Sequence, residues 1–409
     1  MQLRDRAVAT GLTTRAVRIA PIVGLVITAS AVAFLVLQTL DKGLIDLAVF
    51  RAAGRAFLDG TPLYSDEFAR PYGLRFIYAP FAAMLFTPMA IIPVGALEMA
   101  WTIGNIVLVW WILGALLRRA GVSRGSQYIA VALLGIALLL EPVRASFFFG
   151  QINITLMALV VADCAGVIPR RYRGIATGIA AAIKVTPAAF GVLFLLRRDF
   201  RAFFQAIATG IATIIIGFLV APQASLFYWA EEFFRTDRAG SHEYRPNQAL
   251  TGVLARLGLE GSLQEVLWLI GALTIVAAAT WAAYRFARAG DGYVDFGLIA
   301  LASLAAAPFA VSHHWVYTIM LVPMLVAPRY ARWRLLIGAA IVTYIVGPYK
   351  YVEAGSGPNL ETFTIQNGHF WAAMALLAAA VVAAMRLPRT VPAEKTAEPQ
   401  LAMASASGR

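Results

Sequence analysis

Long apolar runs alternate with short polar connections along almost the whole of this 409-residue chain. A membrane-spanning helix needs about 20 apolar residues, and shorter runs are typical of re-entrant or broken segments. The pattern therefore predicts an all-α, polytopic transmembrane protein. We expect twelve membrane segments, several too short for a full crossing: 19–40, 76–93, 97–117, 127–140, 151–168, 174–196, 202–222, 263–284, 296–310, 315–328, 333–348 and 370–386.

The polar connections give this bundle an orientation. Arg and Lys cluster in the two tails and after the runs that end near 117, 168, 196, 284 and 328. Such clusters face the cytoplasm in membrane proteins. The remaining connections then face outward, and they carry most of the 22 acidic residues. We therefore expect a multi-pass protein of the inner (plasma) membrane with both termini in the cytoplasm.

Two runs depart from simple crossings. Run 174–196 has basic clusters at both ends and KVTP in its middle, which predicts two half-helices broken at Pro187 with Lys184 near the tip. Run 76–93 contains three prolines and is expected to cross only part of the membrane. Broken helices at membrane depth usually line a cavity.

The first outward loop, 41–75, contains the stretch DLAVFRAAGRAFLDG, whose apolar residues approximate helical spacing. It predicts an amphipathic helix on the outer face, ended by Asp59 and Gly60. Asp46 stands at its start. Taken alone, Asp46 is best explained as an N-capping residue. A carboxylate acting as a general base is the alternative, and the two roles are compatible.

Composition agrees with a membrane location and excludes other classes. The chain is 60% hydrophobic and only 14% charged, whereas soluble proteins carry about a quarter charged residues. Its net charge of +12 comes from short clusters that form no continuous stripe, so we expect membrane lipids and no nucleic acid as partners. One domain is expected over 1–388, followed by a disordered cytoplasmic tail over 389–409. Cys164 lies in an apolar run and is expected to be inert.

Lys184 is the most informative charge within an apolar run. A lysine at membrane depth costs at least ~2.5 kcal/mol, so it normally faces a cavity or a partner. Its ammonium group could neutralise a lipid phosphate. The alternatives are snorkelling to the interface and pairing with a structural carboxylate.

Three outward connections hold the other candidate residues. Solvated loop residues are the alternative for each of them, but buried amides need partners, and amides at a cavity wall suit sugar hydroxyls. The two adjacent histidines have no Cys or carboxylate ligands beside them, so a hydrogen bond to phosphate or to Asp46 is favoured over a metal site. The candidates are Glu141, Arg144, Gln151 and Asn153 in EPVRASFFFGQIN; His242, Glu243, Asn247 and Gln248 in SHEYRPNQAL; and His313, His314 and Trp315 in PFAVSHHW.

Several short motifs together resemble one family. An interfacial Asp46 after the first span, YAPF, FGQIN, KVTP followed by LLRR, and RPNQ are similar to the actinobacterial polyprenol-phosphate-mannose-dependent α-1,2-mannosyltransferases of the glycosyltransferase C superfamily. The resemblance implies about a dozen transmembrane helices around an outward cavity, a lipid-phosphate-linked mannose donor, and inversion at the anomeric carbon. No cofactor is implied beyond that lipid-linked donor.

Within this family the branch that adds the fifth mannose to a phosphatidylinositol mannoside at the periplasmic face is the most similar. A neighbouring branch, which adds α-1,2-mannose to lipomannan and lipoarabinomannan, shares the pattern. One departure matters: Ile45 precedes Asp46 where the superfamily often has a second acidic residue. A two-carboxylate metal site is therefore not expected.

The resemblance and the residue types together suggest roles. Asp46 would deprotonate the acceptor 2-hydroxyl, while Lys184 and His313 or His314, with Arg144, would hold the donor phosphate. A secondary transporter and a lipid flippase are the rival hypotheses; the chain shows no internal symmetry, and its polar groups gather on one face. The residues expected to contact sugar or acceptor are Tyr78, Glu141, Gln151, Asn153, His242, Glu243, Asn247, Gln248 and Trp315.

Overall fold

We describe a computed structural model over residues 2–69, 73–235, 240–352 and 359–388, with side chains from Ile19 onward. The expected tail 389–409 lies outside the described residues. The described chain is helical throughout, and its only β-type pairing is an isolated bridge between Asn247 and Val311. The predicted all-α class is confirmed.

Within this part of the chain, five helices are long and apolar enough to cross a membrane. They are α1 (Gln2–Lys42, with its span at Ile19–Lys42), α5 (Val94–Arg119), α11 (Phe200–Val220), α14 (Gly261–Arg288) and α19 (Gly368–Met385). A sixth span would combine α6 (Ser126–Leu139) and α7 (Glu141–Phe149), which meet at an angle of 78°. The chain is therefore a multi-pass membrane protein, with fewer full-length spans than the twelve segments predicted.

The other elements are shorter. The remaining α-helices are α2 (Ile45–Asp59), α3 (Asp66–Ala69), α4 (Pro80–Ala90), α8 (Asn153–Cys164), α9 (Ile175–Ile183), α10 (Gly191–Leu196), α12 (Pro222–Ala230), α13 (Leu250–Arg256), α15 (Val294–Ala305), α16 (Leu321–Val326), α17 (Arg334–Val346) and α18 (Leu360–Gln366). The 3-10 helices are η1 (Arg170–Tyr172), η2 (Thr186–Phe190), η3 (Glu232–Phe234), η5 (Ser312–Met320), η6 (Pro328–Trp333) and η7 (Pro348–Tyr351).

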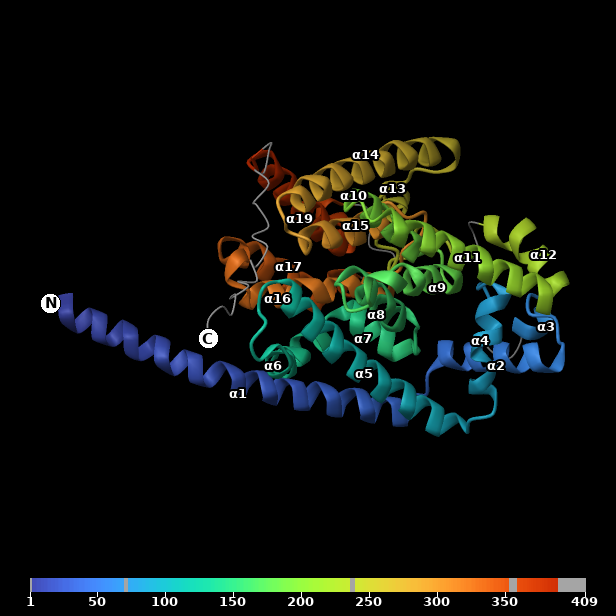
Figure 1. Ribbon diagram of the computed structural model, residues 1–409, viewed down its shortest axis with the longest axis horizontal. Coiled ribbons are helices and arrows are strands. Elements are labelled where there is room, and N and C mark those ends of the chain that lie inside the picture. The colour runs from blue at the N-terminus through green and yellow to red at the C-terminus, as the bar shows by residue number, and fades with distance from the viewer. Residues whose placement is uncertain (1, 70–72, 236–239, 353–358, 389–409) are drawn as a thin grey trace, which may run out of the picture.

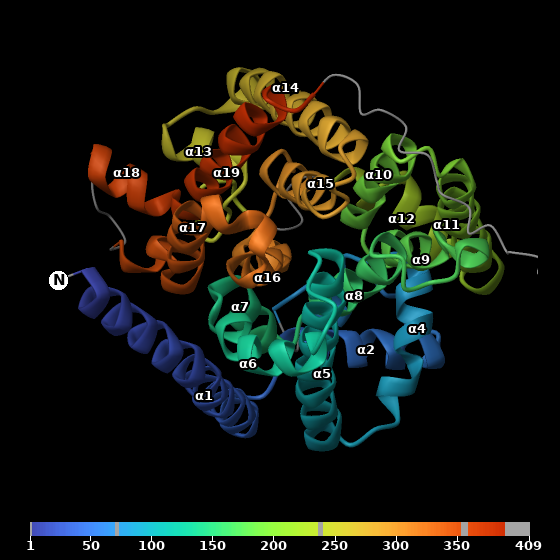
Figure 2. The same cartoon turned by 60° about the vertical axis from the view of Figure 1, so that its left-hand side comes forward.

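The long helices flank the molecule and the short ones fill its middle. Figures 1 and 2 show α1 and α14 on opposite sides, while α8, α9 and α15 lie between them. Helix α1 packs along α6 and α5. The spans of α1, α11 and α14 are the least buried of the five and expose large apolar side chains such as Leu37, Phe204 and Leu273. These faces are suited to lipid contact.

The first loop folds back onto the bundle. Helix α2 occupies the stretch where an amphipathic helix is predicted, and it ends at Gly60 in the left-handed conformation. Its apolar side, including Phe50 and Ala53, packs against α4. The approach is close at Gly54, where an added Cβ would lie 2.3 Å from the carbonyl oxygen of Phe86. Its place on the outer side of the membrane stays a prediction.

Two of the sequence interpretations need adjustment. The run 174–196 is broken, as predicted, but the break falls at Lys184 rather than Pro187: Lys184 is extended after α9, and Pro187 lies in the first turn of η2, where proline is tolerated. The stretch 141–150, expected as a polar outward connection, is instead helix α7, which has Pro142 in its first turn and ends at Gly150.

Candidate functional site

Asp46 lies in the first turn of α2, where a carboxylate is favoured by the helix dipole. It does not cap the helix, because Leu44 occupies the N-cap and no side chain caps there. Instead, the Gln151 side-chain amide donates a hydrogen bond to Asp46 Oδ2 at 2.6 Å. The capping explanation of Asp46 is therefore wrong, and the residue is oriented by a partner from another element.

A glycine allows this contact. Gly150 ends α7 with φ 73°, and a Cβ added there would lie 2.8 Å from Leu44 Cβ and 2.9 Å from Leu47 Cβ. The loop after α7 can therefore touch the start of α2, which brings Gln151 to Asp46. The glycine of the FGQIN motif thus permits a left-handed backbone conformation and a close contact that a larger residue would block.

Two amides link Asp46 to Lys184. The side-chain amide of Asn153 donates to the carbonyl oxygen of His313 at 2.9 Å and lies 3.4 Å from Gln151 Oε1. Its own oxygen accepts from Lys184 Nζ at 3.0 Å. Both amide residues are buried. A chain of contacts therefore runs from the ammonium group to the carboxylate through Asn153 and Gln151.

The break after α9 explains why Lys184 reaches this point. Lys184 leaves the helix with φ −146° and ψ 127° and is followed by the 3-10 helix η2. A lysine inside a continuous helix would extend along its flank, whereas this one stands at a helix end. The predicted location of Lys184 at a break, facing polar groups, is consistent with this geometry.

The two histidines stand at the same place. The backbone of His313 is held by Asn153 and by the Ser146 hydroxyl at 3.1 Å, and its ring lies 4.8 Å from that of His314. Burial, and secondarily the charge of Lys184, lower the pKa of His313 to about 3 and that of His314 well below its usual value. Both rings are therefore neutral at pH 7, so each presents one N–H donor and one acceptor.

Burial raises the pKa of Asp46 above its ordinary value of 3.8, while the hydrogen bond from Gln151 and the charge of Lys184 oppose the rise. Asp46 is thus more basic than an exposed aspartate. The buried ring of Tyr78 lies near Asp46. Tyr78 packs edge-on against Phe50, with 5.4 Å between ring centroids.

Glu141 organises a second group of polar residues beside the first. It is fully buried at the start of α7, and its Oε1 accepts from the Tyr349 hydroxyl at 2.8 Å and pairs with Lys350 Nζ at 2.7 Å. Ser312, next to His313, donates to the same oxygen at 3.3 Å. His369 Nε2 lies 3.9 Å from Glu141 Oε2. This group therefore joins η7, α19 and the histidine loop to α7.

The partners of Glu141 were not among the residues predicted from the sequence. Tyr349 and Lys350 follow the predicted span 333–348 and lie in an outward connection, where a lysine is an ordinary residue, so neither stood out. His369 is the second residue of α19 and is fully buried. Nothing in the sequence connects it with a glutamate more than two hundred residues away.

Other candidate residues lie in different surroundings. Arg144 donates to the Ile345 carbonyl oxygen at 2.8 Å. Trp315 is buried and donates to the Ala310 carbonyl oxygen at 3.3 Å. Neither contact belongs to the amide chain around Asp46, so their roles toward phosphate and sugar stay predictions.

The side-chain amides of the RPNQ loop make hydrogen bonds that fix the loop against the rest of the protein. Asn247 is fully buried: its side chain donates to the His242 carbonyl oxygen at 3.0 Å and accepts from the Ala310 backbone at 3.1 Å. Gln248 donates to the carbonyl oxygens of Arg245 and Gln366. Their side chains support the chain segment that leads to the histidines. Glu243 is exposed on this loop, and the sugar contacts expected of all four residues stay predictions.

No group of three or more His, Cys, Asp or Glu residues in the described part of the chain could hold a metal ion.

The amino-acid sequence is similar to a known protein family and to several curated proteins. A family model described as Glycosyltransferase family 87 matches residues 76–312, which include Lys184 and the amide motif. Two curated proteins named "Polyprenol-phosphate-mannose-dependent alpha-(1-2)-phosphatidylinositol mannoside mannosyltransferase" are similar to this chain. The one from Mycolicibacterium smegmatis is 36% identical over 71% of this chain and 70% of its own length. The one from Mycobacterium tuberculosis is 37% identical over 67% and 68%.

A further relative carries a different name. The Mycolicibacterium smegmatis protein called "Polyprenol-phosphate-mannose-dependent alpha-(1-2)-phosphatidylinositol pentamannoside mannosyltransferase" is 29% identical over 74% of this chain and 74% of its own length. No solved structure matches the chain.

Proposed function

The chain belongs to glycosyltransferase family 87, and from this membership we propose that it transfers mannose from polyprenol-phosphate-mannose to the 2-hydroxyl of a mannose on a phosphatidylinositol mannoside. The family makes it a glycosyltransferase. The donor, the α-1,2 linkage and the acceptor are those named for the relatives that are 36% and 37% identical.

One observation carries the mechanism: Asp46 and Lys184 belong to one cluster, joined by Gln151 and Asn153. Transfer from a glycosyl phosphate needs a base for the acceptor hydroxyl and positive charge for the leaving phosphate. The cluster contains one group of each kind. A structural ion pair would have brought the two charges into direct contact, whereas here amides separate them.

The reaction balances with these groups. Asp46 takes the proton of the acceptor 2-hydroxyl as its oxygen bonds to the anomeric carbon of the donor mannose. The bond between that carbon and the phosphate oxygen breaks, and the electron pair leaves with the phosphate. Attack opposite the leaving group inverts the anomeric carbon. Lys184 and the neutral N–H of His313 or His314 hold the departing phosphate.

Sugar recognition is proposed for the residues around this path. Gln151 and Asn153 adjoin both charged groups and carry donors and acceptors suited to hydroxyls. Tyr78 offers an aromatic face near Asp46. For Glu141 we propose an indirect role, because its contacts hold Ser312 beside the histidines.

The acceptor is proposed to be the tetramannoside, so that the product carries a fifth mannose. The greater identity to the relatives named for phosphatidylinositol mannoside, against 29% for the one named for the pentamannoside, supports this choice. Branching of lipomannan or lipoarabinomannan is the alternative acceptor class.

We also propose that the protein lies in the inner membrane, with about twelve membrane segments, cytoplasmic termini and the Asp46 cluster facing the periplasm. The basic clusters in the connections support this orientation. A membrane location also suits the proposed donor, because a lipid-linked sugar reaches the enzyme through the membrane.

The test is transfer by the purified protein. Radiolabelled polyprenol-phosphate-mannose is offered with phosphatidylinositol tetramannoside, phosphatidylinositol pentamannoside or lipomannan, and the new linkage is analysed. We expect an α-1,2-linked mannose on the tetramannoside. Label that remains on the donor with every acceptor would contradict the proposal. Movement of unchanged donor across vesicle membranes would instead support a flippase.

A further inference from the structure

The start of helix α2 fixes the position of Asp46, which is the second residue of that helix. Leu44 occupies the N-cap position, and a leucine side chain cannot accept a hydrogen bond from the first turn. In a capping box, a Glu or Gln at the third helical position accepts from the backbone N–H of the N-cap residue. That position in α2 is Leu47, which is apolar. An acceptor that fixes this turn therefore has to come from another element.

Glu98 supplies this acceptor from α5. Its Oε1 accepts from the backbone N–H of Leu44 at 2.9 Å, and the two residues are 54 positions apart in the chain. Glu98 is half-buried, and its carboxylate lies against the turn between α1 and α2, because a Cβ added to Gly43 would lie 3.2 Å from the same oxygen. The contact thus completes the first turn of α2 from outside.

The corner between α4 and α5 also holds α2 farther along. Arg51 donates to the carbonyl oxygens of Ala90, at 3.2 Å, and Ile92, at 3.3 Å, where α4 ends. The chain then turns into α5, whose first turns carry Glu98. Helix α2 is therefore fixed to one corner of the protein at two points, its start by Glu98 and its middle by Arg51.

Leu44 connects this contact with the Asp46 cluster. Its side chain is 2% exposed and packs against the end of α7, where a Cβ added to Gly150 would lie 2.8 Å from Leu44 Cβ. The residue after Gly150 is Gln151, which donates to Asp46. The position of Leu44 therefore determines both where α2 begins and how Gln151 approaches Asp46.

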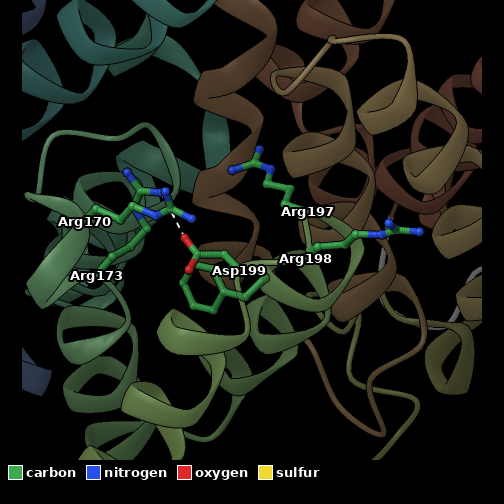
Figure 3. A pocket seen from close by; sticks show the side chains of 6 residues that line it. Arg170, Arg173, Arg197, Arg198 and Asp199 are labelled. Carbon is green, nitrogen blue, oxygen red and sulfur yellow. Dashed lines mark hydrogen bonds and ion pairs between the residues drawn. The ribbon is translucent and has the colours of Figure 1, made fainter. Parts of the chain in front are cut away.

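The lysine side of the cluster has separate supports. Helix α9 leads to Lys184 and packs along α11. Figure 3 shows the opposite end of these two helices, where Arg173, just before α9, pairs at 3.0 Å with Asp199, the N-cap of α11. These supports involve neither α2 nor α5. A shift in the start of α2 should therefore move Asp46 and leave Lys184 in place.

We propose that Glu98 is a positioning residue for the transfer reaction, because its hydrogen bond to Leu44 sets the location of Asp46 relative to Gln151 and the donor. The inference rests on the proposed mannosyl transfer, in which Asp46 is the base. The role belongs to the acceptor oxygen of Glu98 and not to its charge, since a backbone N–H can be satisfied by a neutral oxygen as well.

Three substitutions in the full-length protein test this role. Glu98→Met removes the acceptor, Glu98→Asp keeps the charge but withdraws the carboxylate by one methylene, and Glu98→Gln keeps an oxygen at the same reach. We expect kcat for mannosyl transfer to fall roughly ten- to a hundredfold in Glu98→Met, less in Glu98→Asp, and to stay near the wild-type value in Glu98→Gln. The KM for the donor should change little, because Lys184 stays in place. If Glu98→Met does not fold, the contrast between Asp and Gln answers the same question.

Glu265→Met is the matched control. Glu265 is the fifth residue of α14, as Glu98 is of α5, and it is exposed. Its removal should leave kcat unchanged. Equal kcat in Glu98→Met and Glu265→Met would overturn the proposal. A loss in Glu98→Gln as large as that in Glu98→Met would overturn it too, because the charge would then be what matters.

Hydrogen exchange over residues 43–48 tests the contact separately from catalysis. The amide of Leu44 should exchange about fivefold faster in Glu98→Met than in the wild type and stay protected in Glu98→Gln. Unchanged exchange in Glu98→Met, or faster exchange with kcat unaffected, would overturn the positioning role. A wild type that transfers no mannose would instead contradict the proposed function, and the exchange measurement would still report on the contact between Glu98 and Leu44.

Discussion

Asp46 is the residue on which the proposed chemistry depends most directly. Asp46→Asn keeps the size of the side chain and an oxygen that can accept from Gln151, but it removes the base. We expect the rate of mannosyl transfer by the purified variant to fall by about 10²- to 10⁴-fold. Transfer at the wild-type rate would show that another group takes the proton.

The pH dependence of the reaction should report the same residue. Burial raises the pKa of Asp46 above 3.8, and the base must be ionised, so activity should fall on acidification through a pKa above that value. The rate-against-pH profile of kcat/KM for the free enzyme measures it. An acid limb at or below 3.8 would contradict the assignment.

Stability should respond to Asp46 in the opposite sense from activity. Because its folded-state pKa is raised, the stabilising contribution is full below 3.8 and is lost as pH rises through the folded value. At neutral pH the ionised side chain therefore opposes folding. We expect Asp46→Asn to unfold at the same temperature as the wild type or higher, measured by thermal unfolding in detergent.

Lys184 gives a prediction about the donor. Lys184→Met removes the positive charge next to Asn153, so the KM for polyprenol-phosphate-mannose should rise much more than the KM for the acceptor. Lys184→Arg should recover part of the loss because it restores the charge. Equal changes in both KM values would count against a phosphate role.

For single residues, the residue type indicated a candidate role, but the sequence did not indicate which side chains contact one another. Lys184 could be nominated because a charge is rare in an apolar run, whereas Asp46 and the histidines were nominated from their positions in outward connections, their chemistry and, for Asp46, the family resemblance. The partners of Glu141 could not, because its contact with Tyr349 joins residues 208 positions apart. Asn247 and Gln248 show that residue type can also be ambiguous. Their polar side chains would suit sugar contacts, and they also make buried hydrogen bonds within the protein.

Among the elements, the contact between α2 and the end of α7 is the one that assembles the site. Gly150→Ala should disturb it, because a Cβ would lie 2.8 Å from Leu44 Cβ while φ stays at 73°. Gly60→Ala is the matched control: its φ is 70°, but the space around it is open.

Both variants bear the cost of a left-handed alanine, about 1 kcal/mol. Only Gly150→Ala should also lose activity, because it moves Gln151 relative to Asp46. Transfer assays and thermal unfolding of the two variants separate the effects. Equal activity in both would show that the close approach is unimportant for catalysis.

The apolar pattern predicted where most helices lie along the chain. It did not predict where helices break or the angles between them. The proline of KVTP correctly indicated a break, but its location at Lys184 depends on where α9 loses its last hydrogen bond. The angle of 78° between α6 and α7 had no signal beyond Pro142, which starts a helix as readily as it ends one.

For the whole molecule, orientation in the membrane is the prediction to test. Single cysteines are introduced at Glu243 and at Arg171, both exposed, after Cys164→Ala has removed the natural thiol. A membrane-impermeant maleimide should label Glu243→Cys in intact cells, and Arg171→Cys only after lysis. The reverse pattern would invert the proposed topology.

The amide bridge between Lys184 and Asp46 has a consequence for the order of events. A direct ion pair would hold the carboxylate ionised and weakly basic. Here the charge of Lys184 lies two amides away and still lowers the pKa of Asp46, so its partial neutralisation by an arriving phosphate would make Asp46 a stronger base. Loading of the donor would thus prime the base, and we expect initial-rate kinetics in which the donor binds before the acceptor.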